Sequence, residues 1–105
     1  METTPLTLQN AVERLLACEP EIRSLGVEGL AVFGSVARGE VRPDSDVDLL
    51  VQFSPGAKSY SRFLALSDLL ETLLGYPVEL VTVEALSPFL GPRILAEAKN
   101  VLRAA

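Results

Sequence analysis

The chain has 105 residues, of which 49% are hydrophobic and 22% are charged, and its 9 basic and 14 acidic residues give a net charge of −5 at pH 7. This length predicts one domain with a single core, residues 1–105. The acidic balance argues against bulk nucleic acid as a partner, because affinity for a nucleic-acid backbone comes from Lys and Arg. The apolar runs fall well short of the roughly 20 residues that cross a bilayer, so we expect no membrane association and a cytoplasmic location.

The first part of the chain predicts two helical segments and a strand. Apolar residues at helical spacing predict a helix over residues 8–17, with Thr7 as its N-cap. A further helical turn is expected to end at Gly26. Residues 30–33, LAVF, are an apolar run of strand length, and they deliver the chain to a Gly-Ser pair.

The middle of the chain predicts a strand and a second helix. Residues 46–53 alternate with the two-residue period of a half-buried strand, which places Asp46 and Asp48 on one face and apolar side chains on the other. An amphipathic helix is expected over residues 60–74, ending at Gly75.

The last part of the chain predicts a strand over residues 77–83 and a helix over residues 93–103. The buried stripe of that helix would consist of Ile94, Leu95, Ala98, Val101 and Leu102. The order of elements predicts an α/β (α+β) fold, a small mixed β-sheet with helices on one face. The sheet face that carries the aspartates would stay open.

The two aspartates have the spacing of a metal site. Side chains at i and i+2 of one strand have Cα atoms roughly 6.5 to 7 Å apart, so Asp46 and Asp48 can converge on one hard cation or bridge two. A two-metal site needs such oxygen ligands to stabilise the attacking and leaving oxygens of an in-line displacement. Glu79 would add a third carboxylate, provided that its strand pairs beside that of Asp48. The chain has no histidine, so carboxylates must carry the chemistry.

The Gly-Ser pair could supply the phosphate-binding half of such a site. A strand that ends in Gly34 lets the backbone approach a phosphate without a Cβ in the way, and Ser35 offers both an N–H and a hydroxyl. Arg38 and Arg42 could add charge-assisted hydrogen bonds to the same phosphates. For Arg42, a position in a solvated loop is an equal alternative.

Other interpretations of these residues compete. An EF-hand fails, because Leu49 stands where that loop needs Gly and Pro55 stands where it needs Glu. A P-loop fails, because Lys and Ser/Thr do not follow the second glycine. The remaining alternative makes Asp44 a turn residue, which we accept, and makes Asp46 and Asp48 the solvated face of an edge strand. That alternative does not explain why the two aspartates follow a Gly-Ser turn.

Taken together, residues 34–51, GSVARGEVRPDSDVDLLV, resemble the nucleotidyltransferase signature of the DNA polymerase beta superfamily, a Gly-Ser turn followed by an Asp-x-Asp strand. From Leu30 onward the short chain resembles the minimal nucleotidyltransferases, or MNT proteins. The resemblance implies a DNA polymerase beta-like core that binds ATP or another nucleoside triphosphate with Mg²⁺ in a two-metal site. It also implies transfer of a nucleoside monophosphate to an acceptor.

Carried over by position, Gly34 and Ser35 would hold the triphosphate, and Asp46 and Asp48 would bind the metal ions. Glu79 stands where the family usually has Asp, as the expected base for the acceptor hydroxyl. Its extra methylene moves the carboxylate by about the tolerance of a catalytic site. Metal and nucleotide binding could survive while transfer weakens.

Proteins of this kind are often encoded beside a helical HEPN protein and act as the antitoxin of that ribonuclease, by binding it, by adenylylating it, or both. The resemblance therefore implies a HEPN partner, and we expect either a homo-oligomer or a hetero-oligomer. A chain of this length has no room for a second, acceptor-recognising domain, which also points to another chain. Three functions stay open: nucleotidyl transfer to a protein hydroxyl, inhibition of the partner by binding alone, and nucleotide sensing without transfer.

Overall fold

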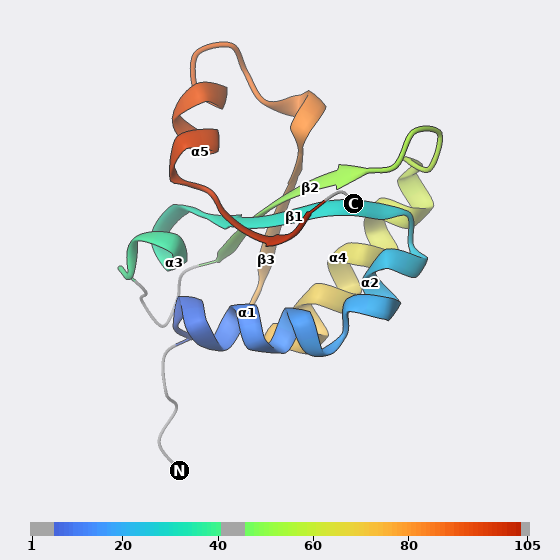
Figure 1. The fold of residues 1–105 in the computed structure, drawn as a ribbon, viewed down its shortest axis with the longest axis horizontal. Helices are drawn as coiled ribbons and strands as arrows, with labels where there is room; N and C mark the ends of the chain where they lie inside the picture. Colours follow the sequence, from blue (N-terminus) through green and yellow to red (C-terminus); the bar gives the residue numbers. More distant parts are fainter. Residues whose placement is uncertain (1–5, 41–45, 104–105) are drawn as a thin grey trace.

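The structure is a computed structural model, and it describes residues 6–40 and 46–103. Helices and strands alternate along most of this length (Figure 1). In chain order the elements are α1 (Leu8–Ala17), α2 (Glu19–Ser24), β1 (Val27–Phe33), α3 (Gly34–Arg38), β2 (Val47–Phe53), α4 (Tyr60–Leu74), β3 (Val78–Thr82), the 3-10 helix η1 (Val83–Ala85), α5 (Gly91–Glu97) and β4 (Lys99–Leu102).

The strands form one mixed sheet in the order β3-β2-β1-β4. β1 pairs antiparallel with both β2 and β4, whereas β2 and β3 are parallel. The parallel pair is joined by α4, because two parallel neighbours need a long crossover connection. The expected pairing of the Asp48 strand with the Glu79 strand is therefore confirmed.

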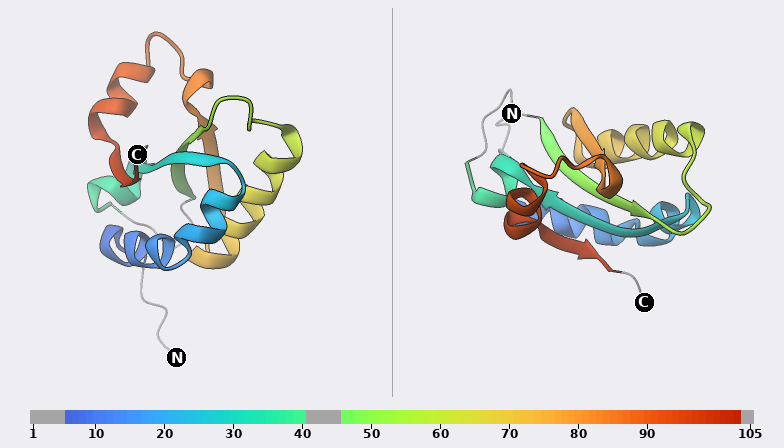
Figure 2. Two further views of the ribbon diagram at one scale, coloured as in Figure 1. Left: turned by 45° about the vertical axis from the view of Figure 1, so that its right-hand side comes forward. Right: turned by 90° about the horizontal axis from the view of Figure 1, so that it is seen from above.

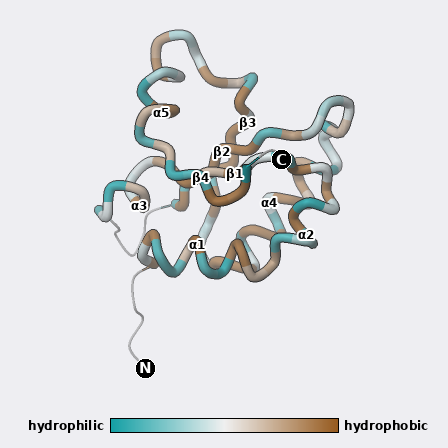
Figure 3. The backbone as a smooth tube through the Cα atoms, viewed as in Figure 1, coloured by the Kyte–Doolittle hydropathy of each residue, from teal (hydrophilic) through white to brown (hydrophobic). Residues whose placement is uncertain are grey.

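Three helices cover one face of the sheet. α1, α2 and α4 lie below the strands in Figure 1, and the left view of Figure 2 shows the same division. Hydrophobic residues run along the central strands (Figure 3) and join the buried sides of these helices in the main core. The predicted fold class, a small mixed sheet with covering helices, is confirmed.

The opposite face of the sheet is partly covered. A second, smaller apolar cluster contains Ala31, Phe33 and Leu50, and residues of η1 and α5, including Ile94, pack against it. α5 lies across the sheet from α1 in Figure 1. The expectation that the face with the aspartates stays open is therefore wrong where η1 and α5 pack against it.

Local sequence signals set several boundaries as expected. The Thr7 hydroxyl accepts a hydrogen bond from the Asn10 N–H at 3.1 Å, which caps α1. α4 ends at Gly75, which has the left-handed conformation of a helix C-cap, with φ 74°. β1 is longer than predicted and begins at Val27 instead of residue 30.

The prediction of a last helix over residues 93–103 is wrong in its second half. α5 ends at Glu97, and residues 99–102 form β4 instead. The free edge of β1 explains the difference, because its unpaired N–H and C=O groups are satisfied by a fourth strand. Leu102 is buried from that strand, whereas Leu95, predicted on the same buried stripe, is 54% exposed.

Across the described ranges 6–40 and 46–103, the structure contains no helix that is both long enough and apolar enough to span a membrane.

Candidate active site

The candidate site lies where three neighbouring strands meet at one end of the sheet. Asp48, in the second position of β2, is in register with Phe33 at the end of β1 on one side and with Glu79 of β3 on the other. Gly34 follows Phe33 directly and begins α3. The strand order therefore brings together the glycine turn and two carboxylates that are 14 and 45 residues distant from it in the chain.

Gly34 is required at the turn for two separate reasons. Its φ of 71° lies in the left-handed region that other residues seldom adopt. A Cβ added to it would overlap the Asp48 side chain, with only 2.9 Å to Asp48 Cγ. The missing side chain thus lets the main chain of α3 lie directly against the Asp48 carboxylate.

Asp48 has an unusual protonation behaviour. Its pKa is raised from 3.8 to about 6, first because the carboxyl is partly buried, and then because it shares a hydrogen bond and negative charge with Glu79. The charge of Asp46 raises the pKa of Asp48 further, and Arg38 opposes these effects. Two carboxyl groups in contact repel when both are ionised, so this pair needs a stronger countercharge than Arg38 supplies.

A divalent cation would supply that countercharge. Carboxylate oxygens are the ligands that hard cations such as Mg²⁺ prefer, and Asp48 and Glu79 fit this chemistry. Asp46 is exposed and directly precedes β2, on the same side as Asp48. Within the described residues, no three His, Cys, Asp or Glu side chains are gathered closely enough to hold a metal ion. The pair would thus need Asp46 to turn inward to complete a three-carboxylate set.

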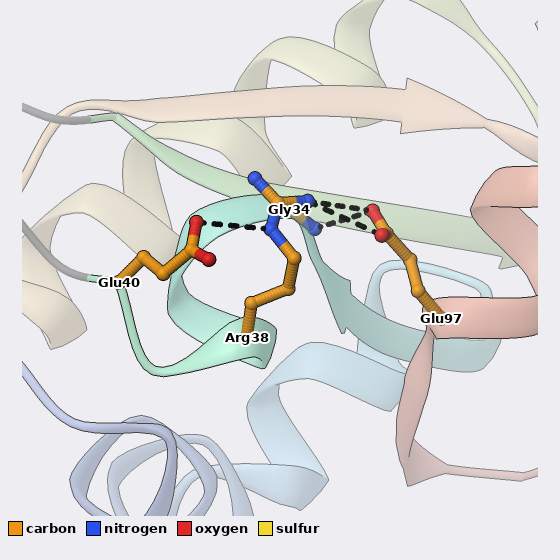
Figure 4. Close-up of polar contacts among 4 residues, drawn as sticks. All are labelled: Gly34, Arg38, Glu40 and Glu97. Carbon is orange, nitrogen blue, oxygen red and sulfur yellow. Dashed lines mark hydrogen bonds and ion pairs between the residues drawn. The ribbon is translucent and has the colours of Figure 1, made fainter.

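Arg38, at the end of α3, has two carboxylate partners. Its Nε donates to Glu40 at 3.2 Å, and its Nη1 donates to Glu97 at 3.2 and 3.3 Å (Figure 4). These contacts, with Glu40 the stronger, raise the pKa of Arg38, so the guanidinium stays charged. Ser35 lies in the same helix and is half-buried.

Glu97 is a part of the site that the sequence did not reveal. It is the last residue of α5, and one of its oxygens, Oε1, accepts a hydrogen bond from the Gly34 N–H at 3.1 Å. Nothing in the helical spacing of the C-terminal segment distinguishes Glu97 from other exposed acids. Only the return of the chain to β1 as β4 places it there.

Two residues of the sequence-based site cannot be placed. Arg42, a predicted phosphate ligand, and Asp44, a predicted turn residue, lie outside the described residues.

A cavity lies farther along the strands than the carboxylates, beside the middle of β1 and the second half of β2. The cavity has a volume of about 250 Å³. Leu50 and Gln52, which lie on the same face of β2 as Asp48, form part of its floor. Val83 of η1 and Leu95 of α5 line it from the side. Among the described residues that line this cavity there is no carboxylate and no member of the sequence-predicted site, so the cavity is separate from the candidate site.

Comparisons with known proteins agree with this geometry. The sequence model described as "Nucleotidyltransferase domain" matches residues 15–101. The protein adenylyltransferase MntA of Thermococcus cleftensis is 41% identical over 97 residues, which cover 91% of this chain and 97% of the relative.

Solved structures share the fold. One, provisionally described as a minimal nucleotidyltransferase, superposes with a TM-score of 0.79 at 38% identity and covers 92% of this chain and 98% of its own. A chain in the complex of a tri-AMPylated Shewanella oneidensis HEPN toxin with an MNT antitoxin gives a TM-score of 0.64 at 17% identity, over 93% of this chain and 74% of that one. The match of the family model and the extent of the identity lead to one conclusion: this chain belongs to the nucleotidyltransferase domain family.

Proposed function

We propose that this protein transfers a nucleoside monophosphate, AMP from ATP, to a hydroxyl group of a partner protein. The observation that carries the proposal is the position of Asp48, which lies between the Gly34 turn of β1 and Glu79 of β3. The name of the Thermococcus relative, a protein adenylyltransferase that aligns along nearly its whole length, supports both the donor and the class of acceptor.

The residues divide into two groups in this reaction. Gly34, Ser35 and Arg38 would contact the triphosphate through backbone N–H groups, a hydroxyl and a guanidinium, and Arg42 could join them. Asp46, Asp48 and Glu79 would hold Mg²⁺, which would supply charge neutralisation at the reacting phosphate.

The chemical step is an exchange of two P–O bonds. The acceptor oxygen forms a bond to the α-phosphorus of ATP, and the bond from that phosphorus to the bridging oxygen breaks, so that pyrophosphate leaves. Glu79 would accept the proton of the acceptor hydroxyl. Its position on β3, directly in register with Asp48 of β2, supports this role, because a general base must lie beside the reacting groups.

The partner that we propose is a HEPN protein, with this chain as its antitoxin. The support is the shared fold with a chain from the complex of an AMPylated HEPN toxin and an MNT antitoxin. The acceptor would be a hydroxyl of that partner, a tyrosine being one candidate.

A second function is favoured by one residue. Because Glu79 replaces the usual Asp of the family, the chain could inhibit its partner by binding alone, with a weak or inactive site. The two functions differ for the double variant Asp46→Asn/Asp48→Asn. Inhibition by binding alone predicts that this variant still protects cells from the partner, whereas inhibition by transfer predicts that protection is lost.

The first experiment is a calorimetric titration of ATP and the other triphosphates into the protein, with and without Mg²⁺, beside the double variant. Binding that requires Mg²⁺ and is lost in the variant would support a working nucleotide site. Intact-mass measurement of the co-purified partner then tests transfer, since each transfer adds the mass of one adenylyl group. A partner that never gains mass would contradict the enzymatic proposal. If the protein then still binds nucleotide, its function would be that of a nucleotide sensor.

A further inference from the structure

We propose that Glu97 is an internal competitor of the nucleotide, which occupies the anion-binding groups of the site until a phosphate displaces it. This inference rests on the proposed function, since it assumes that Gly34 and Arg38 bind phosphate. It adds a regulatory contact that neither the motif nor the metal-binding carboxylates contain.

The geometry shows Glu97 in the place of a ligand. One carboxylate contacts two donors from α3: the Gly34 N–H donates to Oε1 at 3.1 Å, and Arg38 Nη1 lies 3.2 Å from Oε2 (Figure 4). A backbone N–H beside a guanidinium is the donor set that proteins offer to a phosphate oxygen pair. A carboxylate, which has two acceptor oxygens and one negative charge, mimics half of that anion.

Glu40 provides the contrast within the same structure. It also pairs with Arg38, but through Nε and from the exposed loop that follows α3, and no contact joins it to Gly34 among the described residues. Its side chain is 67% exposed, whereas that of Glu97 is 26% exposed. Glu40 is thus a surface ion pair, and Glu97 is a partly buried group on the donors themselves.

The fold keeps Glu97 beside these donors. Lys99, two residues later, is in register with Val32 of β1, so the sheet holds the end of α5 close to the Phe33–Gly34 step. The backbone at Glu97 can therefore stay in place while its side chain rotates away. Displacement of the Glu97 side chain breaks its ion pair with Arg38 and its hydrogen bond from the Gly34 N–H. An incoming triphosphate would replace both contacts.

The consequence is a reduced apparent affinity for nucleotide. When only a fraction of the molecules has its donors free, the apparent dissociation constant rises by the inverse of that fraction. The contact also keeps Arg38 directed at the site while no nucleotide is bound. Removing the charge of Glu97 should therefore free the donors without removing any group that contacts the phosphates.

The test is a titration of Mg²⁺-ATP into the full chain and into Glu97→Gln, followed by calorimetry and by the amide resonance of Gly34 in NMR spectra. We expect the dissociation constant of Glu97→Gln to be about three- to tenfold lower than that of the wild type, as the loss of a contact of this kind allows. The Gly34 amide of the unliganded variant should shift upfield, because its acceptor is no longer charged.

Glu40→Gln is the matched control, since it removes the same charge from the other partner of Arg38. Equal tightening by both variants, or unchanged or weaker binding by Glu97→Gln, would overturn the inference while leaving the nucleotide site intact. If neither the wild type nor Glu97→Gln binds Mg²⁺-ATP, the proposed function itself fails and this inference fails with it.

Discussion

The position of Asp48 disfavours an ionised carboxylate, so the charge of Asp48 lowers the free energy of unfolding. Partial burial and the contact with Glu79 raise its pKa from 3.8 to about 6, so at neutral pH the folded chain holds a charge that its surroundings disfavour. Such a group is typical of a site that is completed by a bound cation. In the proposed function, Asp48 would serve ligand binding at the expense of stability.

The substitution Asp48→Asn should stabilise the protein at pH 7. The folded-state pKa lies above the unfolded value, so the folded chain binds the extra proton between about pH 4 and pH 6. The wild type therefore loses stability relative to the variant as pH rises through this window, and the difference vanishes below it. We expect a gain of about 1 kcal/mol at pH 7, a small value because the site is partly exposed to screening.

Urea unfolding from pH 4 to pH 8 without divalent cations would measure this difference. Asp46→Asn is the control, because Asp46 is exposed and its substitution should change the free energy of unfolding by less than about 0.5 kcal/mol. A variant that is less stable than the wild type at pH 7 would show that Asp48 makes favourable contacts in its charged form.

Gly34→Ala should distort the site as well as strain the backbone. Gly39 allows the two effects to be separated, since its φ of 74° matches the 71° of Gly34, but a Cβ there meets nothing within 4 Å. We expect Gly39→Ala to cost about 1 to 2 kcal/mol, the strain of a left-handed residue. Gly34→Ala should cost more, because its Cβ overlaps Asp48, and it should also abolish Mg²⁺-ATP binding. Equal costs in thermal unfolding would contradict the close contact with Asp48.

At the scale of elements, the sequence predicted those parts whose boundaries have local causes. α1 and α4 have the predicted bounds, because a cap residue and a glycine define their ends. Alternation predicted the face of each carboxylate, whereas the pairing of the Asp48 strand with the Glu79 strand was a hypothesis that the structure confirms. β4 was missed, because its four residues continue a helical spacing and only the unpaired edge of β1 makes them a strand.

The same non-local cause hid Glu97. Its contact with Gly34 spans 63 residues and depends on the register of β4 against β1. Local patterns carry no information about such a register. The sequence thus predicted that Asp48 and Glu79 lie side by side, but it could not predict that Glu97 reaches Gly34 from α5.

The substitutions Leu102→Ala and Leu95→Ala test the corrected end of the chain. Leu102 is 3% exposed and belongs to the main core, whereas Leu95 is 54% exposed on α5. We expect Leu102→Ala to lower the free energy of unfolding by about 2 to 4 kcal/mol, and Leu95→Ala by less than about 1 kcal/mol. Chemical denaturation of the two variants and the wild type would measure both losses. Similar losses would instead agree with one continuous helix that buries both leucines.

At the scale of the whole molecule, several positive side chains of the described residues already have polar partners within the fold. Arg14 and Arg62 each donate to a main-chain carbonyl at 2.7 Å. Arg23, Arg38 and Lys58 pair with glutamates. The net charge of −5 adds an excess of negative charge, which repels a phosphate backbone.

The protein should therefore bind a single nucleotide but no nucleic-acid polymer. A triphosphate needs only the few donors beside Gly34 and arrives with its own cation, whereas a polymer places many phosphates against an acidic surface. We expect fluorescently labelled single-stranded RNA and duplex DNA to show no saturable anisotropy change at about 0.15 M salt, so any dissociation constant exceeds about 10⁻⁴ M. Labelled ATP with Mg²⁺ in the same buffer is the positive control. Polymer binding in the micromolar range that weakens steeply with salt would contradict this prediction, because it requires a basic surface. The acceptor in the proposed reaction would then be a nucleic acid instead of a protein hydroxyl.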